Sequence, residues 1–238
     1  MYELKRNDHG LQIRGLKSSL LHSTERYYEH LDARRRGGGQ HFHGRDVGEC
    51  PRSIVLRWLG VAPPPMSLSR RWMMEDGLHI EARVVRMYES AGLIAHQNAR
   101  LKRTYKVNGA YITVVGVADI ILKQPPEDTL QSGRGSILVE VKSTSPEKFN
   151  MWKELHDIPQ QYRDQANLYC GMFGLQWGIL HLHSRGENEF RIRTFQLDEE
   201  RNWYQLHRFA EIQAMYLRGE LPESDHDGYW CSYWKACS

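Results

Sequence analysis

The sequence predicts an α/β domain, because hydrophobic strands are interspersed along the chain with segments of helical periodicity. Residues 110–123, AYITVVGVADIILK, and residues 137–144, ILVEVKST, are rich in β-branched and aliphatic residues and are expected to be strands. Residues 68–91 and 159–173 carry apolar residues at helical spacing, and the second of these segments begins with proline. Such helices are expected to flank a central sheet.

Turn-forming residues and caps divide the rest of the chain. The loop at 37–49 opens with three glycines and follows a predicted N-terminal helix. Three prolines at 63–65 interrupt the chain, and Ser67 is expected to cap the helix after them. Pro146 ends the strand 137–144. The further expected elements are helices at 16–36, 50–60 and 198–218, and strands at 94–106, 176–184 and 189–196.

Length, charge and composition narrow the class of protein. The chain has 238 residues, of which 40% are hydrophobic, so it can form one large domain with a core. Its 32 basic and 29 acidic residues give a formal net charge of +3, which does not by itself indicate nucleic acid. No apolar run reaches the roughly 18 residues of a transmembrane helix, and the N-terminus lacks the apolar core of a signal peptide. We therefore expect an intracellular protein outside the membrane, whose four cysteines are metal ligands or buried thiols rather than disulfides.

Two charged residues, Glu140 and Lys142, interrupt the hydrophobic strand 137–144. Side chains two residues apart in a strand point to the same face, so this carboxylate and ammonium share one face. The aliphatic residues at positions 137, 139 and 141 occupy the other face. Charged side chains are rarely buried unless they are paired or functional. One interpretation is an ion pair on a solvated edge strand, and the other is a functional site.

A third charged residue, Asp119, lies near the end of the preceding strand. Gly116, three residues earlier, is expected to let another backbone approach closely. An aspartate in an apolar strand is costly unless it binds something. Carboxylates on two adjacent strands can hold a hard divalent cation such as magnesium through their oxygen atoms. A neighbouring lysine can stabilise negative charge in a transition state or orient a water.

Further residues arranged around these strands make the pattern specific. His79 lies in the helix before the strands, and Gln165 and Tyr169 lie one helical turn apart in the helix after them. The order His79, Gly116–Asp119, Glu140–Lys142, Gln165–Tyr169 resembles the RecB-type or Cas4-type branch of the PD-(D/E)XK nuclease superfamily. The resemblance covers residues from about 50 to the end of the chain. Ala118, where the family often has proline, is the one departure from the motif.

The resemblance implies a fold and a domain arrangement. The fold would be a restriction-endonuclease-like core, in which a central mixed β-sheet is flanked by helices. Residues 50–238 would form the nuclease domain with a cysteine-bearing C-terminal tail, and residues 1–49 would be an N-terminal helix and loop that pack on it.

The resemblance also implies roles for individual residues. The metal ligands would be His79, Asp119, Glu140 and the carbonyl of Val141, and the metal would be Mg²⁺ or Mn²⁺. Lys142 would position the attacking water and stabilise charge on the phosphate during phosphodiester hydrolysis. Gln165 and Tyr169 would support the site and contact DNA. The expected activity is that of a DNA exonuclease acting on free ends or single strands and leaving a 5′-phosphate.

The cysteines match part of a second motif of Cas4-type nucleases. Cys50, Cys231 and Cys237 occupy three of the four positions that bind a [4Fe–4S] cluster in that family, and Gly228 stands at the fourth. His226, near the gap, is a candidate substitute ligand. The alternatives are a zinc site or residues held by packing alone. Cys170 is expected to be a buried thiol.

Basic and aromatic residues offer candidate DNA contacts. The basic clusters are Arg34–Arg36, Arg70–Arg71, and Arg100, Lys102, Arg103 and Lys106, and the aromatic residues that could stack on unpaired bases are Trp152, Trp203, Tyr229, Trp230, Tyr233 and Trp234. The alternative for most of these residues singly is solvated charge or core packing. Two other functions stay open: a catalytically silent DNA-binding or assembly subunit on the same fold, and a structure-selective or sequence-specific endonuclease.

Overall fold

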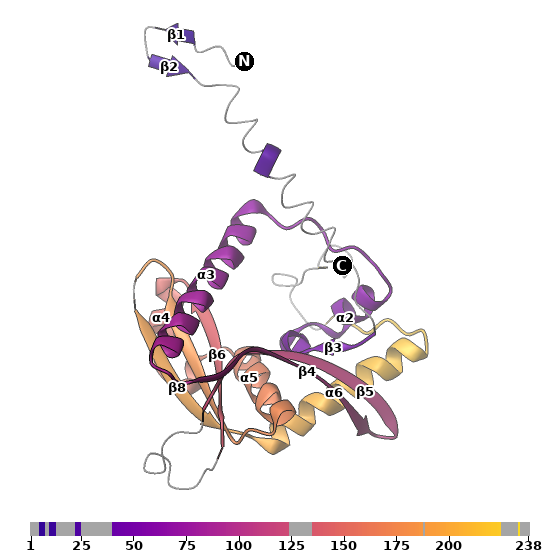
Figure 1. Cartoon of the computed structure of the whole chain (residues 1–238). Coiled ribbons are helices and arrows are strands. Elements are labelled where there is room, and N and C mark those ends of the chain that lie inside the picture. The colour runs from indigo at the N-terminus through magenta and orange to yellow at the C-terminus, as the bar shows by residue number, and fades with distance from the viewer. Residues whose placement is uncertain are drawn as a thin grey trace. The chain divides into compact units, whose positions relative to one another are not determined.

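The computed structural model consists of two units, Met1–Gly39 and Gln40–Ser238 (Figure 1). The residues that it describes are 5–7, 10–12, 22–24, 40–123, 135–187, 189–224 and 233. Residues 40–49, which the predicted boundary assigns to the N-terminal segment, belong to the second unit.

The first unit contains a short hairpin that the sequence did not predict. Strands β1 (Lys5–Asn7) and β2 (Gly10–Gln12) pair antiparallel, with Asn7 opposite Gly10. Residues 22–24 are helical, as predicted. The rest of the predicted helix 16–36 lies outside the described residues.

A mixed sheet of six strands forms the centre of the second unit, as predicted. These strands are β3 (Phe42–His43), β4 (Ile94–Val107), β5 (Ala110–Leu122), β6 (Ile137–Thr144), β7 (Trp177–Ser184) and β8 (Phe190–Gln196). Their order is β3-β5-β6-β7-β8, and β4 pairs with β5. The pairs β3–β5 and β6–β7 are parallel, and the other pairs are antiparallel.

Strands β5 and β6 pair over only three positions, and this limited pairing positions the candidate site. Their register joins Leu122 to Ile137 and ends where Ile120 lies opposite Val139. The first half of β5 pairs with β3 instead. Asp119 and Glu140 therefore stand where the two strands separate.

The helices begin and end within two residues of the predicted positions. They are α2 (Pro51–Trp58), α3 (Leu68–Ser90), α5 (Gln160–Phe173) and α6 (Glu199–Leu217). Ser67 caps α3 as predicted, because its hydroxyl accepts a hydrogen bond from the Arg70 N–H at 3.3 Å. The αL backbone of Gly174, at φ 70°, ends α5.

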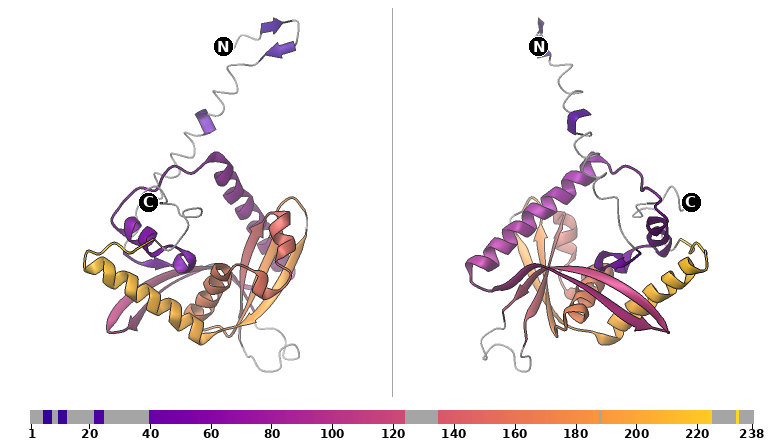
Figure 2. Two further views of the ribbon diagram at one scale, coloured as in Figure 1. Left: turned by 180° about the vertical axis from the view of Figure 1, so that it is seen from behind. Right: turned by 45° about the vertical axis from the view of Figure 1, so that its right-hand side comes forward.

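Helices cover both faces of the sheet, as the views in Figure 1 and Figure 2 show. On one face, Ile80, Val84 and Tyr88 of α3 pack against Val139 and Val141 of β6. The larger core cluster lies on the other face and includes residues of β6, β7, α5 and α6, namely Leu138, Leu180, Leu182, Leu168 and Phe209. The opposite faces of β6 therefore belong to two separate hydrophobic clusters.

Several short elements have no counterpart among the predicted helices and strands. They are β3, the 3-10 helix η1 (Gly44–Gly48), α4 (Pro146–Met151) and the 3-10 helix η2 (Leu155–Asp157). Tertiary contacts stabilise two of them: Phe42 of β3 is fully buried and stacks on Phe209, and Phe149 of α4 is also fully buried. Segments of two to six residues show too little periodicity for a prediction.

Within the described part of the chain, no helix has the length and apolar character that a membrane span needs.

Candidate active site

Strand β6 carries its two charged residues into the interior of the domain. It lies between β5 and β7, and Glu140 is only 2% exposed. The interpretation of an ion pair on a solvated edge strand is therefore wrong. Val139 and Val141 pack against α3, as the alternation predicted.

Lys142 links β6 to helix α5. Its Nζ donates hydrogen bonds to Glu140 Oε1 at 2.7 Å and to Gln165 Oε1 at 3.1 Å. Gln165 Nε2 in turn donates to the Tyr169 hydroxyl at 3.2 Å, across one turn of α5. The Tyr162 ring lies 5.3 Å from the same ammonium, within cation–π range. Helix α5 thus brings Gln165 and Tyr169, which the sequence predicted as site residues, next to Lys142.

Asp119 joins this group from β5. Its Oδ2 accepts a hydrogen bond from the Val141 N–H at 2.8 Å, which ties the two strands together where their ladder has ended. The pKa of Asp119 lies well above its ordinary value, mainly because the carboxyl is buried and further because Glu140 is close. Lys142 opposes this increase but does not cancel it.

The charges around Lys142 favour its protonated form. Burial alone would lower the pKa of this lysine, but the carboxylates of Glu140 and Asp119 outweigh burial and raise it. Burial, with the charge of Glu140, also raises the pKa of Tyr169 to about 12, so its hydroxyl stays protonated. The site therefore holds one fixed cation beside buried carboxylates.

Helix α3 contributes a carboxylate that the sequence reasoning missed. The pKa of Glu81 is raised, mainly by burial and further by the charge of Glu140, while Lys142 opposes the increase. Glu81 is therefore close to both residues. His79, the predicted ligand, is exposed. Residues two apart on a helix differ by about 200° in direction, so His79 and Glu81 point to opposite sides. Glu81 shares a helical stripe with buried Val84 and Tyr88, and this spacing was the available signal.

The Tyr169 ring fits between two glycines. A Cβ at Gly44 would lie 2.0 Å from Tyr169 Cε1, and one at Gly116 would lie 2.9 Å from the same atom. The sequence predicted a close approach at Gly116, but by a backbone; the side chains of Tyr169 and Met172 approach instead. Both glycines keep Tyr169 in reach of Gln165.

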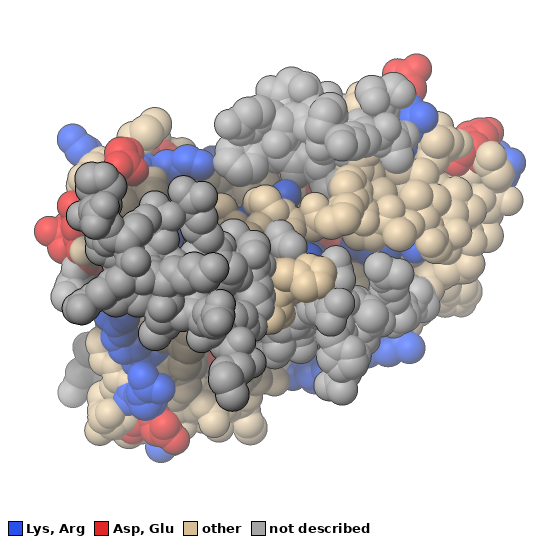
Figure 3. All heavy atoms as spheres, turned by 90° about the horizontal axis from the view of Figure 1, so that it is seen from above, with Lys and Arg blue, Asp and Glu red and all other residues tan. Residues whose placement is uncertain are grey.

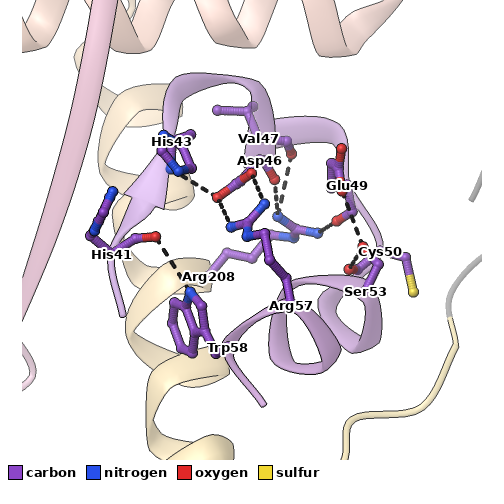
Figure 4. A network of polar contacts seen from close by, with 10 residues as sticks. All are labelled: His41, His43, Asp46, Val47, Glu49, Cys50, Ser53, Arg57, Trp58 and Arg208. Carbon is purple, nitrogen blue, oxygen red and sulfur yellow. Dashed lines mark hydrogen bonds and ion pairs between the residues drawn. The ribbon is translucent and has the colours of Figure 1, made fainter. Parts of the chain in front are cut away.

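A polar network holds η1, and with it Gly44, against the rest of the domain (Figure 4). The fully buried Asp46 accepts two hydrogen bonds from Arg57 of α2, at 2.8 and 2.5 Å, and one from the His43 N–H at 2.8 Å. Arg208 of α6 donates to the carbonyl oxygens of Asp46, Val47 and Glu49. These contacts pair the buried Asp46 carboxylate and three backbone carbonyl oxygens of the turn.

The structure also locates other residues singled out in the sequence. Cys170 is fully buried, as predicted, and burial raises its thiol pKa to about 12. Trp152 is 5% exposed in the core, so it is not placed to stack on a base. Cys50 is buried at the N-cap of α2. Tyr233 packs on Leu56 of α2. The predicted positions 226, 228, 231 and 237 lie outside the described residues, as do Arg34–Arg36.

The carboxylates of this site supply only part of the ligand set of a divalent cation. Among the described residues, no three His, Cys, Asp or Glu side chains are grouped to hold a metal ion by themselves, so neither His79 nor Glu81 completes a set of three with Asp119 and Glu140. However, Glu140 Oε2 is buried and has no hydrogen-bond partner in the described part of the chain. This orphaned oxygen, next to the buried Asp119, fits a hard cation that takes its remaining ligands from backbone or water.

The mixed sheet with helices on both faces is a restriction-endonuclease-like fold, and comparison with solved structures gives the same class. The structure described as SSO0001 matches with a TM-score of 0.56 and 16% identity, over 93% of this chain and 96% of that one. LHK-Exo in complex with dAMP matches with a TM-score of 0.54 and 12% identity, over 75% of this chain and 91% of that one.

A second LHK-Exo structure, described as an alkaline exonuclease from Laribacter hongkongensis, has a TM-score of 0.49 and 13% identity over 76% of this chain and 93% of that one. No model of a known protein family matches the sequence, and no curated protein matches it. At these sequence identities the likeness shows a shared fold and nothing more.

Proposed function

We propose that this protein is a metal-dependent deoxyribonuclease of the RecB/Cas4 type that hydrolyses phosphodiester bonds. The observation that carries the proposal is the buried group of Asp119, Glu140 and Lys142 at the point where β5 and β6 separate. A buried carboxyl group whose pKa is raised, as that of Asp119 is, is costly to the fold, and such groups concentrate at functional sites. The fold shared with LHK-Exo supports the same function.

Asp119, Glu140 and the carbonyl of Val141 would hold the Mg²⁺ or Mn²⁺ ion. Glu81 is the residue of α3 best placed to contribute, either directly or through water, and the sequence-based candidate His79 would have to turn from the opposite side of the helix. The bound ion would act as a Lewis acid toward the phosphate and lower the pKa of a water. The unpartnered Glu140 Oε2 supports this assignment.

Lys142 supplies the positive charge of the protein itself. The hydrogen bonds to Glu140 and Gln165 fix its ammonium, and the raised pKa keeps it protonated at neutral pH. A fixed, desolvated cation stabilises charge that develops on the phosphate oxygens, because it needs no reorientation during the reaction. Gln165 positions Lys142 and, being only half-buried, is a candidate for contact with DNA. Tyr169 is 5% exposed, so it supports Gln165 from the core and is not placed to touch DNA.

The proposed substrate is DNA with a free end or a single strand, cut as an exonuclease. The experiment measures degradation of labelled DNA in Mg²⁺ or Mn²⁺ by the wild type and by the Asp119→Ala and Glu140→Ala variants. We expect both variants to lose cleavage and to keep DNA binding. A circular single-stranded substrate separates the modes of action, because an exonuclease cannot start on it and an endonuclease can.

The second candidate function is a catalytically silent DNA-binding or assembly subunit. It is favoured by the position of His79, which leaves the carboxylates short of a third ligand of the predicted type. It would be the better account if the wild type bound DNA but failed to cut single-stranded, duplex or flapped substrates.

We further infer that Cys50, Cys231 and Cys237 bind one metal centre, either a [4Fe–4S] cluster or zinc. Tyr233 lies between the two tail cysteines in sequence and packs on Leu56, in the helix that Cys50 caps. In Figure 4 the Cys50 side chain points away from the Asp46 network. Anaerobic purification followed by metal and sulfide analysis distinguishes the two centres, and a protein without either element would overturn the inference.

A further inference from the structure

Strand β4 is a long edge strand whose two faces differ in character. It pairs with β5 from Ala99 to Val107 without a register shift. Ala99, Leu101 and Tyr105 face the core. The intervening positions are Arg100, Lys102, Thr104 and Lys106, all of which are exposed. Three of these four residues are basic, so one face of the strand carries a row of positive charge.

The neighbouring basic residue Arg103 belongs to the other face and has a structural role. Its guanidinium donates hydrogen bonds to the carbonyl oxygens of Gly171 and Met172, in the last turn of α5. A cation at the C-terminal end of a helix stabilises it through the helix dipole. The four-residue basic cluster in the sequence is therefore two groups, and Arg100, Lys102 and Lys106 form what we call the β4 ladder.

The part of the sequence around the β4 ladder is free of acidic residues. Residues 94–118 contain no Asp or Glu. The residues opposite Arg100, Lys102 and Lys106 in β5 are Val117, Val115 and Tyr111, and Tyr111 is 65% exposed. His41, near the same strands, has a pKa below its ordinary value because of burial and because Lys102 and Arg57 are positive. Figure 3, a view from above, shows Lys and Arg side chains near its centre as well as at its edges.

The β4 ladder also leads toward the candidate active site. Val117, opposite Arg100, precedes Asp119 by two residues on the more exposed side of β5. At about 3.3 Å per residue, Arg100 stands within about 10 Å of Asp119 along the sheet, and the row to Lys106 extends roughly 20 Å further. That length matches about six nucleotides at roughly 3.4 Å per nucleotide along one strand of a duplex.

We propose that the β4 ladder binds the phosphate backbone of the DNA strand that enters the active site. This inference rests on the proposed function and adds the surface on which the substrate lies. Lys and Arg side chains on one face of a strand neutralise successive phosphates without reading base sequence. Tyr111, at the far end, offers an exposed ring for a base.

The experiment measures the fluorescence anisotropy of a labelled duplex with a single-stranded overhang as salt is raised from about 50 to about 200 mM. EDTA is present, because it stops metal-dependent cleavage and removes divalent ions that compete for phosphates. The test variant is the double substitution Arg100→Gln/Lys102→Gln. Its matched control is Arg86→Gln/Lys153→Gln, which removes the same charge from other exposed positions.

Each lost phosphate contact reduces the steepness of the plot of log affinity against log salt by roughly 0.9. The test variant, which lacks two such contacts, is therefore expected to have a slope that is shallower by about 1.8. The control should keep the wild-type slope, as should the charge-preserving variant Arg100→Lys/Lys102→Arg, which also tests for misfolding. Equal slopes for test variant, control and wild type would overturn the proposal.

Cleavage by the wild type, measured in parallel in Mg²⁺, separates this proposal from the proposed function. If the wild type cuts DNA but the salt slope does not depend on the β4 ladder, the ladder proposal is overturned and the proposed nuclease function stands. If binding depends on the ladder but the wild type does not cut DNA, the ladder proposal stands and the proposed nuclease function is overturned. A wild type that neither binds nor cuts DNA overturns both.

Discussion

Replacing Gly44 by alanine tests whether the Tyr169 ring is held where Lys142 needs it. The new Cβ would lie 2.0 Å from Tyr169 Cε1, whereas ordinary contact begins at 3.4 Å, so the ring or the η1 turn must shift by about 1.4 Å. Overpacking of this kind costs about 1–3 kcal/mol of the free energy of unfolding. A misplacement of about 1 Å near a reacting group can also cost roughly 100-fold in rate.

Chemical denaturation measures the stability of the Gly44→Ala variant, and DNA cleavage measures its activity. Gly135→Ala is the matched control, because a Cβ at Gly135 meets nothing within 4 Å, and its effect should stay within about 0.5 kcal/mol. In a Tyr169→Ala background the Gly44 substitution should cost much less, since the clashing ring is gone. The reasoning fails if Gly44→Ala is as stable and active as the control.

Three more outcomes follow from the same structure. Glu81→Gln should weaken Mn²⁺ binding, followed by calorimetry, and lower cleavage, whereas His79→Ala should change neither; the reverse would restore His79 as the ligand. Stability should fall as pH drops from about 6.5 toward about 4, because burial lowers the folded-state pKa of His43 to about 4 and the unfolded histidine takes up a proton first. The urea midpoint of unfolding should depend less on pH in His43→Gln than in the wild type, whereas the exposed control His156→Gln should keep the wild-type dependence. Finally, Cys170 should resist alkylation in the native protein, because its thiol pKa is about 12 and little thiolate exists at neutral pH.

The long elements of the fold could be predicted from sequence because their signals are local. Strand 137–144 matches β6 residue for residue, and the predicted cap Ser67 is found at α3. The charged pair Glu140 and Lys142 could also be placed on one face from strand periodicity alone. What periodicity cannot say is whether a strand is central or at an edge, and this left the ion-pair interpretation open until the sheet order was known.

The parts of the site that were missed depend on contacts between distant segments. The helical spacing of Glu81 places it on the same stripe as Val84 and Tyr88, but the sequence does not show that this stripe packs on β6 and so brings Glu81 near Glu140. Gly44 lies in a glycine-rich loop. It must lack a side chain because the Tyr169 ring of α5 occupies the space where a Cβ would lie. Arg103 was grouped with its basic neighbours, although β pairing turns it to the opposite face.

The central claim is that Lys142 and the carboxylates beside it cut DNA, and one measurement tests it most directly. End-labelled DNA is incubated with Mg²⁺ or Mn²⁺ and either the wild type, Lys142→Ala or the control Lys123→Ala, whose ammonium is exposed and donates to the Gly92 carbonyl. We expect the wild type and the control to degrade the label in a metal-dependent way and Lys142→Ala to lose at least about 100-fold. Degradation that is equal in all three, or absent from the wild type, would contradict the account.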